Sequence, residues 1–150
     1  MPVDTQPFRR EIKSIGGVDI QVMYYFDVAL DKWLSVTETT FMHARNSMNY
    51  AGYLRSINGV QETGTHGPMV PYDCTIVWVA LMAENTPDTN AQIWSNGANL
   101  GALTWNSGAE YYATDIDVDQ GQNISVNILL NGLGVQPNRP IATMGMRWRL

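Results

Sequence analysis

The stretch Pro71-Tyr-Asp-Cys-Thr-Ile-Val-Trp-Val-Ala-Leu-Met82 decides the fold. Proline fixes φ and aspartate can bond its own backbone, so Pro71 and Asp73 predict a turn. The residues that follow are mostly β-branched, aromatic or apolar, which favours a strand. Because apolar side chains fill both alternating positions, we expect a strand covered on both faces, by a second sheet and by a neighbouring subunit.

The rest of the chain shows the same pattern of short strands separated by Gly, Pro and Asn. The Asn58-Gly59 and Asn96-Gly97 pairs are two-residue hairpin signals. Alternating apolar residues predict strands at Val18–Val22, at Ile124–Leu130 and at Ile141–Leu150, the last with Ala142, Met144, Met146, Trp148 and Leu150 on one face. Only the 42–53 window could hold a turn of helix. The pattern is typical of an antiparallel β-sandwich or jelly roll.

Composition supports one globular domain with an arm. The chain has 150 residues and is 45% hydrophobic, so it can bury a core without the help of disulfides or metal sites. Residues Met1–Gly17 are polar and end in two glycines, so we expect an N-terminal arm, followed by a β-sandwich domain over 18–150. Charged residues are only 15% and only two are lysines, which favours a neutral surface suited to ordered assemblies.

The charge and the apolar runs exclude several classes of partner. A net charge of −5 with scattered arginines lacks the basic stripe that nucleic-acid binding needs. The longest apolar-leaning run, Val22–Leu30, contains Asp27 and is too short to insert in a membrane. The first 17 residues lack the apolar core of a secretion signal, so we expect a soluble chain made in a cytoplasm.

The sequence offers no set of metal ligands or catalytic groups. His43, His66 and Cys74 stand alone in different segments, whereas structural zinc needs four N or S ligands. We interpret both histidines as surface or loop residues and Cys74 as a buried, inert thiol. No activated serine or cysteine motif and no phosphate-binding glycine loop is present, so we expect neither an enzyme nor a cofactor.

The acidic run Asp115-Ile-Asp117-Val-Asp119 begins like a calcium-binding loop. An EF-hand has glycine at its sixth position and glutamate at its twelfth, and those positions are Gln120 and Val126 here. We therefore interpret the run as the solvent face of a strand. A cation held by oxygens near Asp115–Asp119 stays open as an alternative.

The five tryptophans divide by their context. Trp33, Trp78 and Trp148 lie in strand patterns and are candidates for the core or a subunit interface. Trp94 and Trp105 flank the 96–103 segment and are candidates for binding a ligand such as a sugar, with core packing as the alternative.

Several stretches together resemble a known family: Tyr24–Asp27, Asp31–Val36, Gly52–Arg55 and Pro71–Ile76. These are similar to a segment that recurs in virion proteins of tailed phages and some other viruses. The Pro-x-Asp-x-Thr-Ile strand and Gln120–Val126 also resemble the tumour-necrosis-factor/C1q-like jelly rolls at the tips of bacterial and phage fibres. Cys74 and Gln122 depart from the commoner Gly and Asp at those positions. The resemblance implies a jelly roll of ten strands or fewer, often trimeric, with a structural or adhesive role and no catalytic residues.

Two functions from different classes follow from this resemblance. The first is a homotrimeric capsid decoration, cement or head-spike protein of a virion, made in the host cytoplasm. Its N-terminal arm would bind the viral capsid protein, with candidate contact residues Phe8, Arg9, Arg10 and Ile12. The alternative is a receptor-binding fibre tip that recognises host-surface glycans through the 84–90 or 131–140 loops.

Overall fold

The computed structural model describes residues 8–15, 17–46, 52–56, 62–129 and 134–150, and over these ranges the fold is all-β. Every pairing between its strands is antiparallel, and the described residues contain no helix. The described strands are β1 (Phe8–Ile15), β2 (Val18–Asp27), β3 (Lys32–Ala44), β4 (Gly52–Tyr53), β5 (Arg55–Ser56), β6 (Cys74–Met82), β7 (Thr89–Ser95), β8 (Ala98–Trp105), β9 (Ala109–Val118), β10 (Ser125–Leu129) and β11 (Ile141–Arg149).

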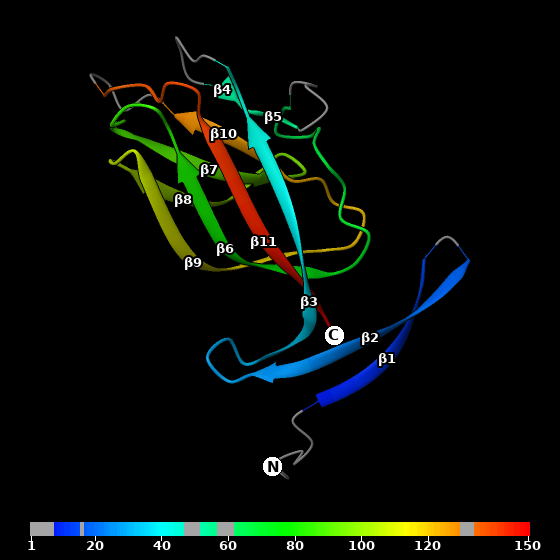
Figure 1. Ribbon diagram of the computed structural model, residues 1–150. Helices are drawn as coiled ribbons and strands as arrows, with labels where there is room; N and C mark the ends of the chain where they lie inside the picture. Colours follow the sequence, from blue (N-terminus) through cyan, green and yellow to red (C-terminus); the bar gives the residue numbers. More distant parts are fainter. Residues whose placement is uncertain (1–7, 16, 47–51, 57–61, 130–133) are drawn as a thin grey trace.

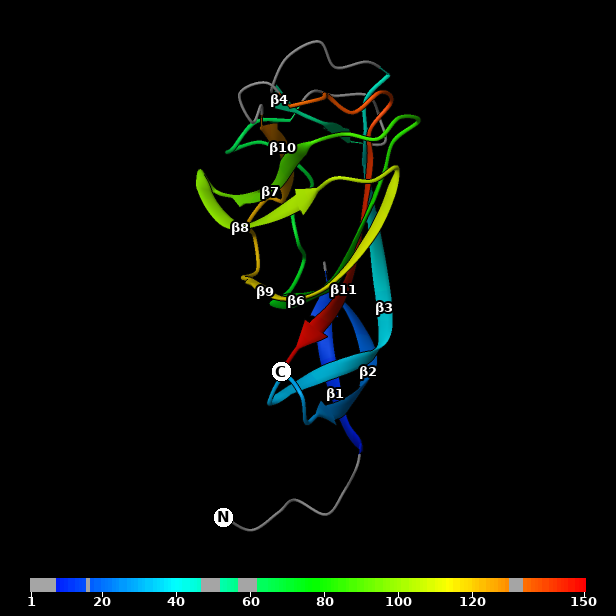
Figure 2. The ribbon, with the colours of Figure 1, turned by 90° about the vertical axis from the view of Figure 1, so that its left-hand side faces the viewer.

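The strands form two sheets (Figure 1). The large sheet has the order β1-β2-β3-β11-β6-β9, with β5 beside β3, and the small sheet has the order β4-β10-β7-β8. In Figure 2 the body of the large sheet and the small sheet lie on opposite sides of the molecule. The described residues include no helix that is long and apolar enough to cross a membrane.

One hydrophobic core fills the space between the two sheets. The large sheet contributes Ile76, Val79, Leu81, Ala142 and Met144, and all of them are fully buried. The small sheet contributes the facing side chains of Ala91, Ile93, Trp105, Val126 and Ile128. The alternation predicted for the C-terminal strand is confirmed at Ala142, Met144 and Met146, which point into this core.

The core covers one face of the central strand β6. Cys74, Ile76, Val79 and Leu81 lie in the core, whereas the other face ranges from the fully buried Thr75 through half-buried residues to Met82, which is 54% exposed. The expectation of a strand covered on both faces is therefore met on one face within a single chain. Most of the second face stays partly accessible in the single chain.

Local turn chemistry is confirmed where the structure describes it. Asn96 (φ 47°) and Gly97 (φ 82°) make the two-residue turn between β7 and β8, in the positive-φ region that such hairpins require. The Asn58-Gly59 signal lies outside the described residues. Within the 42–53 window, residues 42–44 end β3 and residues 45–46 follow it without a helical turn, while 47–51 lie outside the described residues.

The N-terminal arm is a β-hairpin. Phe8–Ile15 pairs along its whole length with Val18–Tyr25, so the expected boundary after Gly17 falls inside the hairpin's turn. Only Tyr24–Asp27 of β2 pairs with β3, and the remainder of the hairpin projects away from the body (Figures 1 and 2). We call the paired segments Phe8–Ile15 and Val18–Met23 the arm.

Candidate functional site

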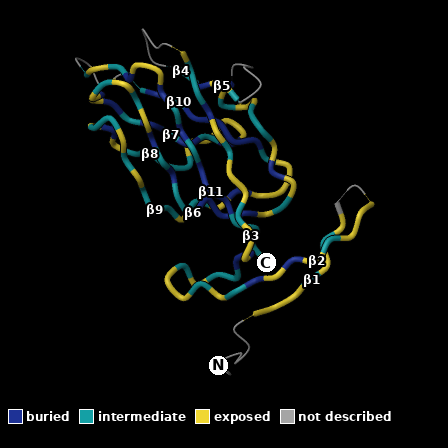
Figure 3. Tube along the Cα trace, viewed as in Figure 1, coloured by how far each residue is buried: buried dark blue, intermediate teal, exposed yellow. Residues whose placement is uncertain are grey.

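The arm exposes apolar side chains on one face, which we call the arm face. Residues paired across an antiparallel ladder point to the same side, so Phe8, Arg10, Ile12 and Met23 share this face. Ile12 is 71% exposed and Phe8 is 53% exposed, and Figure 3 shows the exposed course of β1. Three of the four candidate arm residues therefore lie together on one surface.

On the opposite face, β1 contributes the charged Arg9, Glu11 and Lys13, and β2 contributes Ile20, Val22 and Tyr24. Arg9 lies 3.0 Å and Lys13 lies 4.0 Å from the carboxylate of Glu11 between them. Arg9, the fourth candidate residue, thus points away from Ile12. These exposed pairs contribute little stability, so the arm needs other contacts to hold its direction.

Tyr24 fixes the base of the arm against the body. Its side chain is fully buried, and burial, followed by the charges of Glu11 and Tyr72, raises its pKa to about 12. Val22, two residues further into the arm, is also buried. Trp148 packs against Tyr72 with ring centroids 5.1 Å apart, so the C-terminal end of β11 lies beside the same aromatic residue.

Two basic side chains bind the acidic run of β9. Lys32 lies 2.5 Å from Asp115 and 2.8 Å from Asp117, and Arg149 pairs with Asp117 and with Asp119. The side chains lie on the outside of the strand as expected, yet each carboxylate has a basic partner. Within the described residues there is no group of three or more His, Cys, Asp or Glu side chains able to hold a metal ion.

The outer surface of the large sheet carries an apolar strip. The pairing places Met42, Thr143, Ala80 and Tyr111 in one row across four strands, all on the side away from the core. Tyr111 is 66% exposed. We call the exposed apolar residues of this surface, together with the half-buried Trp78, the outer patch: Val36, Met42, Trp78, Met82 and Tyr111.

A bonded network crosses the outer patch and fixes its geometry. The indole of Trp78 occupies the space where a Cβ of Gly145 would lie, stacks on Tyr111 at 5.8 Å and 25°, and donates to Glu38 at 2.9 Å. Glu38 in turn pairs with Arg147 at 3.3 Å. The Arg147 guanidinium lies 5.5 Å from the ring centre of Tyr25, at the base of the arm. The network therefore links the outer patch to the arm.

The other candidate tryptophans occupy different environments. Trp33 is half-buried against Phe26, with ring centroids 5.5 Å apart. Trp94 is half-buried on the small sheet, packs edge-on against Tyr53 and donates its N–H to Gln92. Trp105 is fully buried in the core and donates to the carbonyl of Ser107, so its ring offers no surface to a ligand. Of the two ligand-loop candidates, only Trp94 is accessible.

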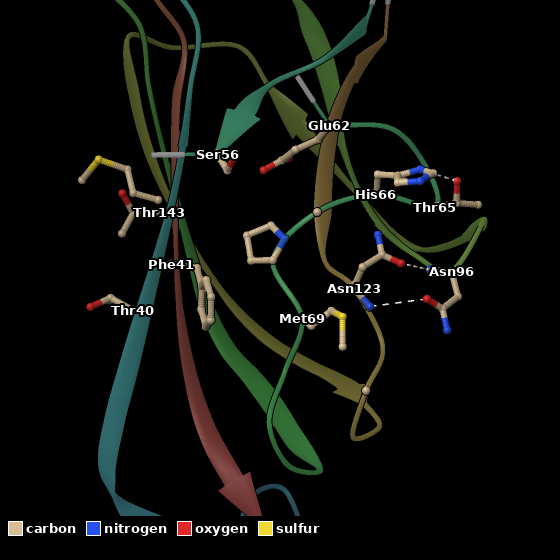
Figure 4. Close-up of a pocket in the computed structure, with 14 residues that line it drawn as sticks. Thr40, Phe41, Ser56, Glu62, Thr65, His66, Met69, Asn96, Asn123 and Thr143 are labelled. Carbon is tan, nitrogen blue, oxygen red and sulfur yellow. Dashed lines mark hydrogen bonds between the residues drawn. The ribbon is translucent and has the colours of Figure 1, made fainter. Parts of the chain in front are cut away.

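Beside β3 lies a hollow of about 1000 Å³, which we call the β3 hollow (Figure 4). One side is formed by three consecutive residues of β3, Thr40–Met42. The other side is formed by Thr65–Met69 and by Asn96 and Asn123. Because consecutive strand residues point to opposite faces, a hollow that touches three in a row runs along the edge of the strand.

A buried hydrogen-bonded pair, His43 and Glu62, lies next to the hollow. His43 Nδ1 is 2.7 Å from Glu62 Oε1, and both side chains are almost completely buried. The interpretation of His43 as a surface or loop residue is therefore wrong, whereas His66 does lie in an exposed loop, bound to Thr63 and Thr65. His43 shares the inward parity of Phe41, which is the one sequence signal that could have placed it inside.

Cys74 is buried and free, as expected. Burial raises the pKa of its thiol to about 12, with the opposing charge of Arg149 too weak to restore it. The thiol is protonated at neutral pH and lies in the core, where no substrate reaches it.

No protein-family model matches the chain, and neither a curated protein nor a solved structure is significantly similar to it. Function must therefore be argued from the surfaces just described.

Proposed function

We propose that the chain is a structural protein of a virus particle, a decoration, cement or head-spike protein that binds the shell through its arm and assembles as a homotrimer. The observation that carries this proposal is the projecting arm, whose arm face exposes Phe8, Ile12 and Met23 to solvent. An isolated two-stranded hairpin is marginally stable in water, so a projecting one implies a surface that covers it.

The strand order supports a jelly-roll sandwich as the body. We set aside β1, β2 and β5 and number the remaining strands one to eight in chain order. The large sheet then reads 1-8-3-6 and the small sheet 2-7-4-5. Strands one to four thus alternate between the sheets, as do strands five to eight, which is the winding of a double Greek key. This winding supports the jelly-roll fold that the resemblance implies.

The outer patch supports self-association. Trp78, Met82 and Tyr111 lie on the outer surface of the large sheet, against which no other described strand pairs or packs a third layer. Exposed apolar patches of this kind mark interaction sites, and closed symmetric assembly would bury three equivalent patches at once. The low content of charged residues, at 15%, is consistent with a surface that contacts other subunits.

Particle binding tests the proposal in the virus whose genome encodes the chain. Mass spectrometry of purified particles should find the wild-type protein, and a Phe8→Asp/Ile12→Asp double variant should be lost from the particles while remaining folded. Val135→Asp is the matched control, because Val135 is 51% exposed and lies far from the arm in the sequence. Purified particles without the wild-type protein would contradict the proposal.

The second candidate is a fibre tip that recognises host-surface glycans. It is favoured by the partly exposed ring of Trp94 beside Tyr53, since sugars stack on such rings. Glycan-array binding that disappears in Trp94→Ala and persists in Trp33→Ala would place this candidate above the first.

A further inference from the structure

β3 carries a bulge at residues 35–37, which we call the β3 bulge. Arg147 of β11 pairs with Glu38, whereas Arg149, two residues later, pairs with Leu34. The three residues of the β3 bulge therefore stand opposite a single residue of β11. A bulge interrupts the strand ladder and bends the strand that carries it. Figures 1 and 2 show β3 changing direction as it approaches β2.

The β3 bulge lies where the arm separates from the body. β2 pairs with β3 only through residues 24–27, and Tyr24 pairs with Ser35, the first residue of the bulge. On the other side of the bulge, β3 follows β11 into the body from Glu38 to Ala44. The bend at the bulge therefore sets the angle at which the arm leaves the body.

Side-chain hydrogen bonds hold the β3 bulge in one shape. Arg147 Nη1 donates to the carbonyls of Ser35 and Val36, each at 2.9 Å. The buried hydroxyl of Ser35 donates to the carbonyl of Thr37 at 2.6 Å and accepts the backbone N–H of Trp148 at 2.9 Å. These bonds satisfy backbone groups in the part of β3 where the ladder is interrupted.

The same guanidinium also contacts β2 and the body. It lies 5.5 Å from the ring centre of Tyr25, two residues beyond the arm, and its Nη2 lies 3.3 Å from the carboxylate of Glu38. The Arg147 side chain is 24% exposed, so most of it is withdrawn from solvent. The planar fork of arginine can bind several acceptors and stack on a ring at the same time, which a lysine ammonium cannot do. Arg147 thus joins the bulge, the base of the arm and the body.

We propose that Arg147 is a positioning residue for the arm, which it holds at one angle to the body by fixing the shape of the β3 bulge. Burial of Tyr24 attaches the base of the arm, and Arg147 sets its direction. This inference rests on the proposed function, in which the arm binds the shell. An element that is already held in its binding direction loses less conformational freedom when it binds.

The distance between two spin labels tests the inference directly. Labels at Ser14→Cys in the arm and Ala102→Cys on the small sheet report the angle of the arm. Both positions are exposed, whereas the native Cys74 is buried and stays unlabelled. An excess of unlabelled chains confines the signal to label pairs within one chain. The otherwise wild-type protein should give one narrow distance peak, and Arg147→Met should replace it with a broad distribution.

Arg139→Met is the matched control. Arg139 also pairs with a glutamate, at 2.7 Å from Glu84, but it precedes β11, whereas Arg147 lies near the end of that strand. The narrow peak should remain in this control.

Two milder variants separate the positioning role from a loss of folding. Arg147→Lys keeps the charge but lacks the planar fork. Ser35→Ala removes the hydroxyl that joins the β3 bulge to β11. Both should broaden the peak, by less than Arg147→Met does, and they decide the question by the same measurement if Arg147→Met does not fold.

A narrow wild-type peak that persists in the Arg147 and Ser35 variants would overturn the inference, as would a broad distribution in wild type itself. In virus particles, Arg147→Met should be retained about fivefold less than Arg139→Met, because a mobile arm must be ordered on binding. Equal retention of the two variants would remove the positioning role. Absence of wild type from the particles would contradict the proposed function alone, since the distance measurement needs no particle.

Discussion

His43 and Glu62 are the most demanding residues of the interior, since both carry polar groups and both are buried. Glu62→Leu leaves the buried His43 without its hydrogen-bond partner, and an unsatisfied buried polar group costs about 1–3 kcal/mol. The double variant His43→Leu/Glu62→Leu should recover most of this loss, because no unpaired polar group remains. Urea unfolding of the three proteins checks both expectations, and a single variant as stable as wild type would contradict them.

Gly145 matters because the Trp78 indole rests on it. A Cβ at this position would overlap the ring and crowd Glu38, so Gly145→Ala should tilt the ring and break its hydrogen bond to Glu38. We expect a loss of about 1–3 kcal/mol, the usual cost of overpacking. A shifted Trp78 indole N–H resonance would report the displacement. Thr143→Ala, on the same strand, is the control. An unmoved resonance in Gly145→Ala would rule out close packing of the Trp78 indole on Gly145.

At the scale of single residues, sequence reasoning succeeded where one property decides the outcome. Cys74 was predicted inside because a lone cysteine in an apolar strand packs well there, and it is buried. His43 was misplaced because its burial depends on Glu62, which reaches it from 19 residues away along the chain. Trp105 shows the same limit, since only the packed sheets reveal that its ring lies in the core.

At the scale of elements, Lys32 at the start of β3 joins that strand to β9, and this makes stability pH-dependent. Partial burial alone would raise the pKa of Asp117, but hydrogen bonds from Lys32 and Thr75 and the charge of Arg149 lower it overall. A lowered folded pKa contributes stability above the unfolded value of about 3.9, and the contribution is lost as the pH falls through the folded pKa.

Asp117→Asn should therefore remove part of the acid-induced loss of stability. Urea midpoints of wild type and variant should differ most at neutral pH and converge as the pH falls toward 3. Asp19→Asn, in the arm, is the control for loss of one carboxylate. A gap between Asp117→Asn and wild type that stays constant across this range would show that the ion pairs do not set the pH dependence.

The elements themselves were largely predictable because their signals are local. Alternation and turn residues predicted the strands at Val18, Ile124 and Ile141 and the Asn96-Gly97 hairpin. The arm was expected as a plain extension, because the polar Phe8–Lys13 segment shows no clean alternation of its own. Its pairing with β2 is a contact between two strands, and the sequence of neither segment predicts it alone.

At the scale of the whole molecule, the all-β architecture could be read from strand length and spacing, and the structure agrees. Which surfaces stay open could not be read, because exposure depends on the order of strands in each sheet. The outer patch arises where β3, β11, β6 and β9 lie side by side and align Met42 with Tyr111.

The central claim is that copies of the chain cover these open surfaces, and native mass spectrometry of the purified protein tests it most directly. We expect wild type at three times the chain mass of 16.7 kDa, and Tyr111→Asp, which places a charge in the outer patch, at the mass of one chain. A wild-type protein that stays at 16.7 kDa at high concentration would contradict the account.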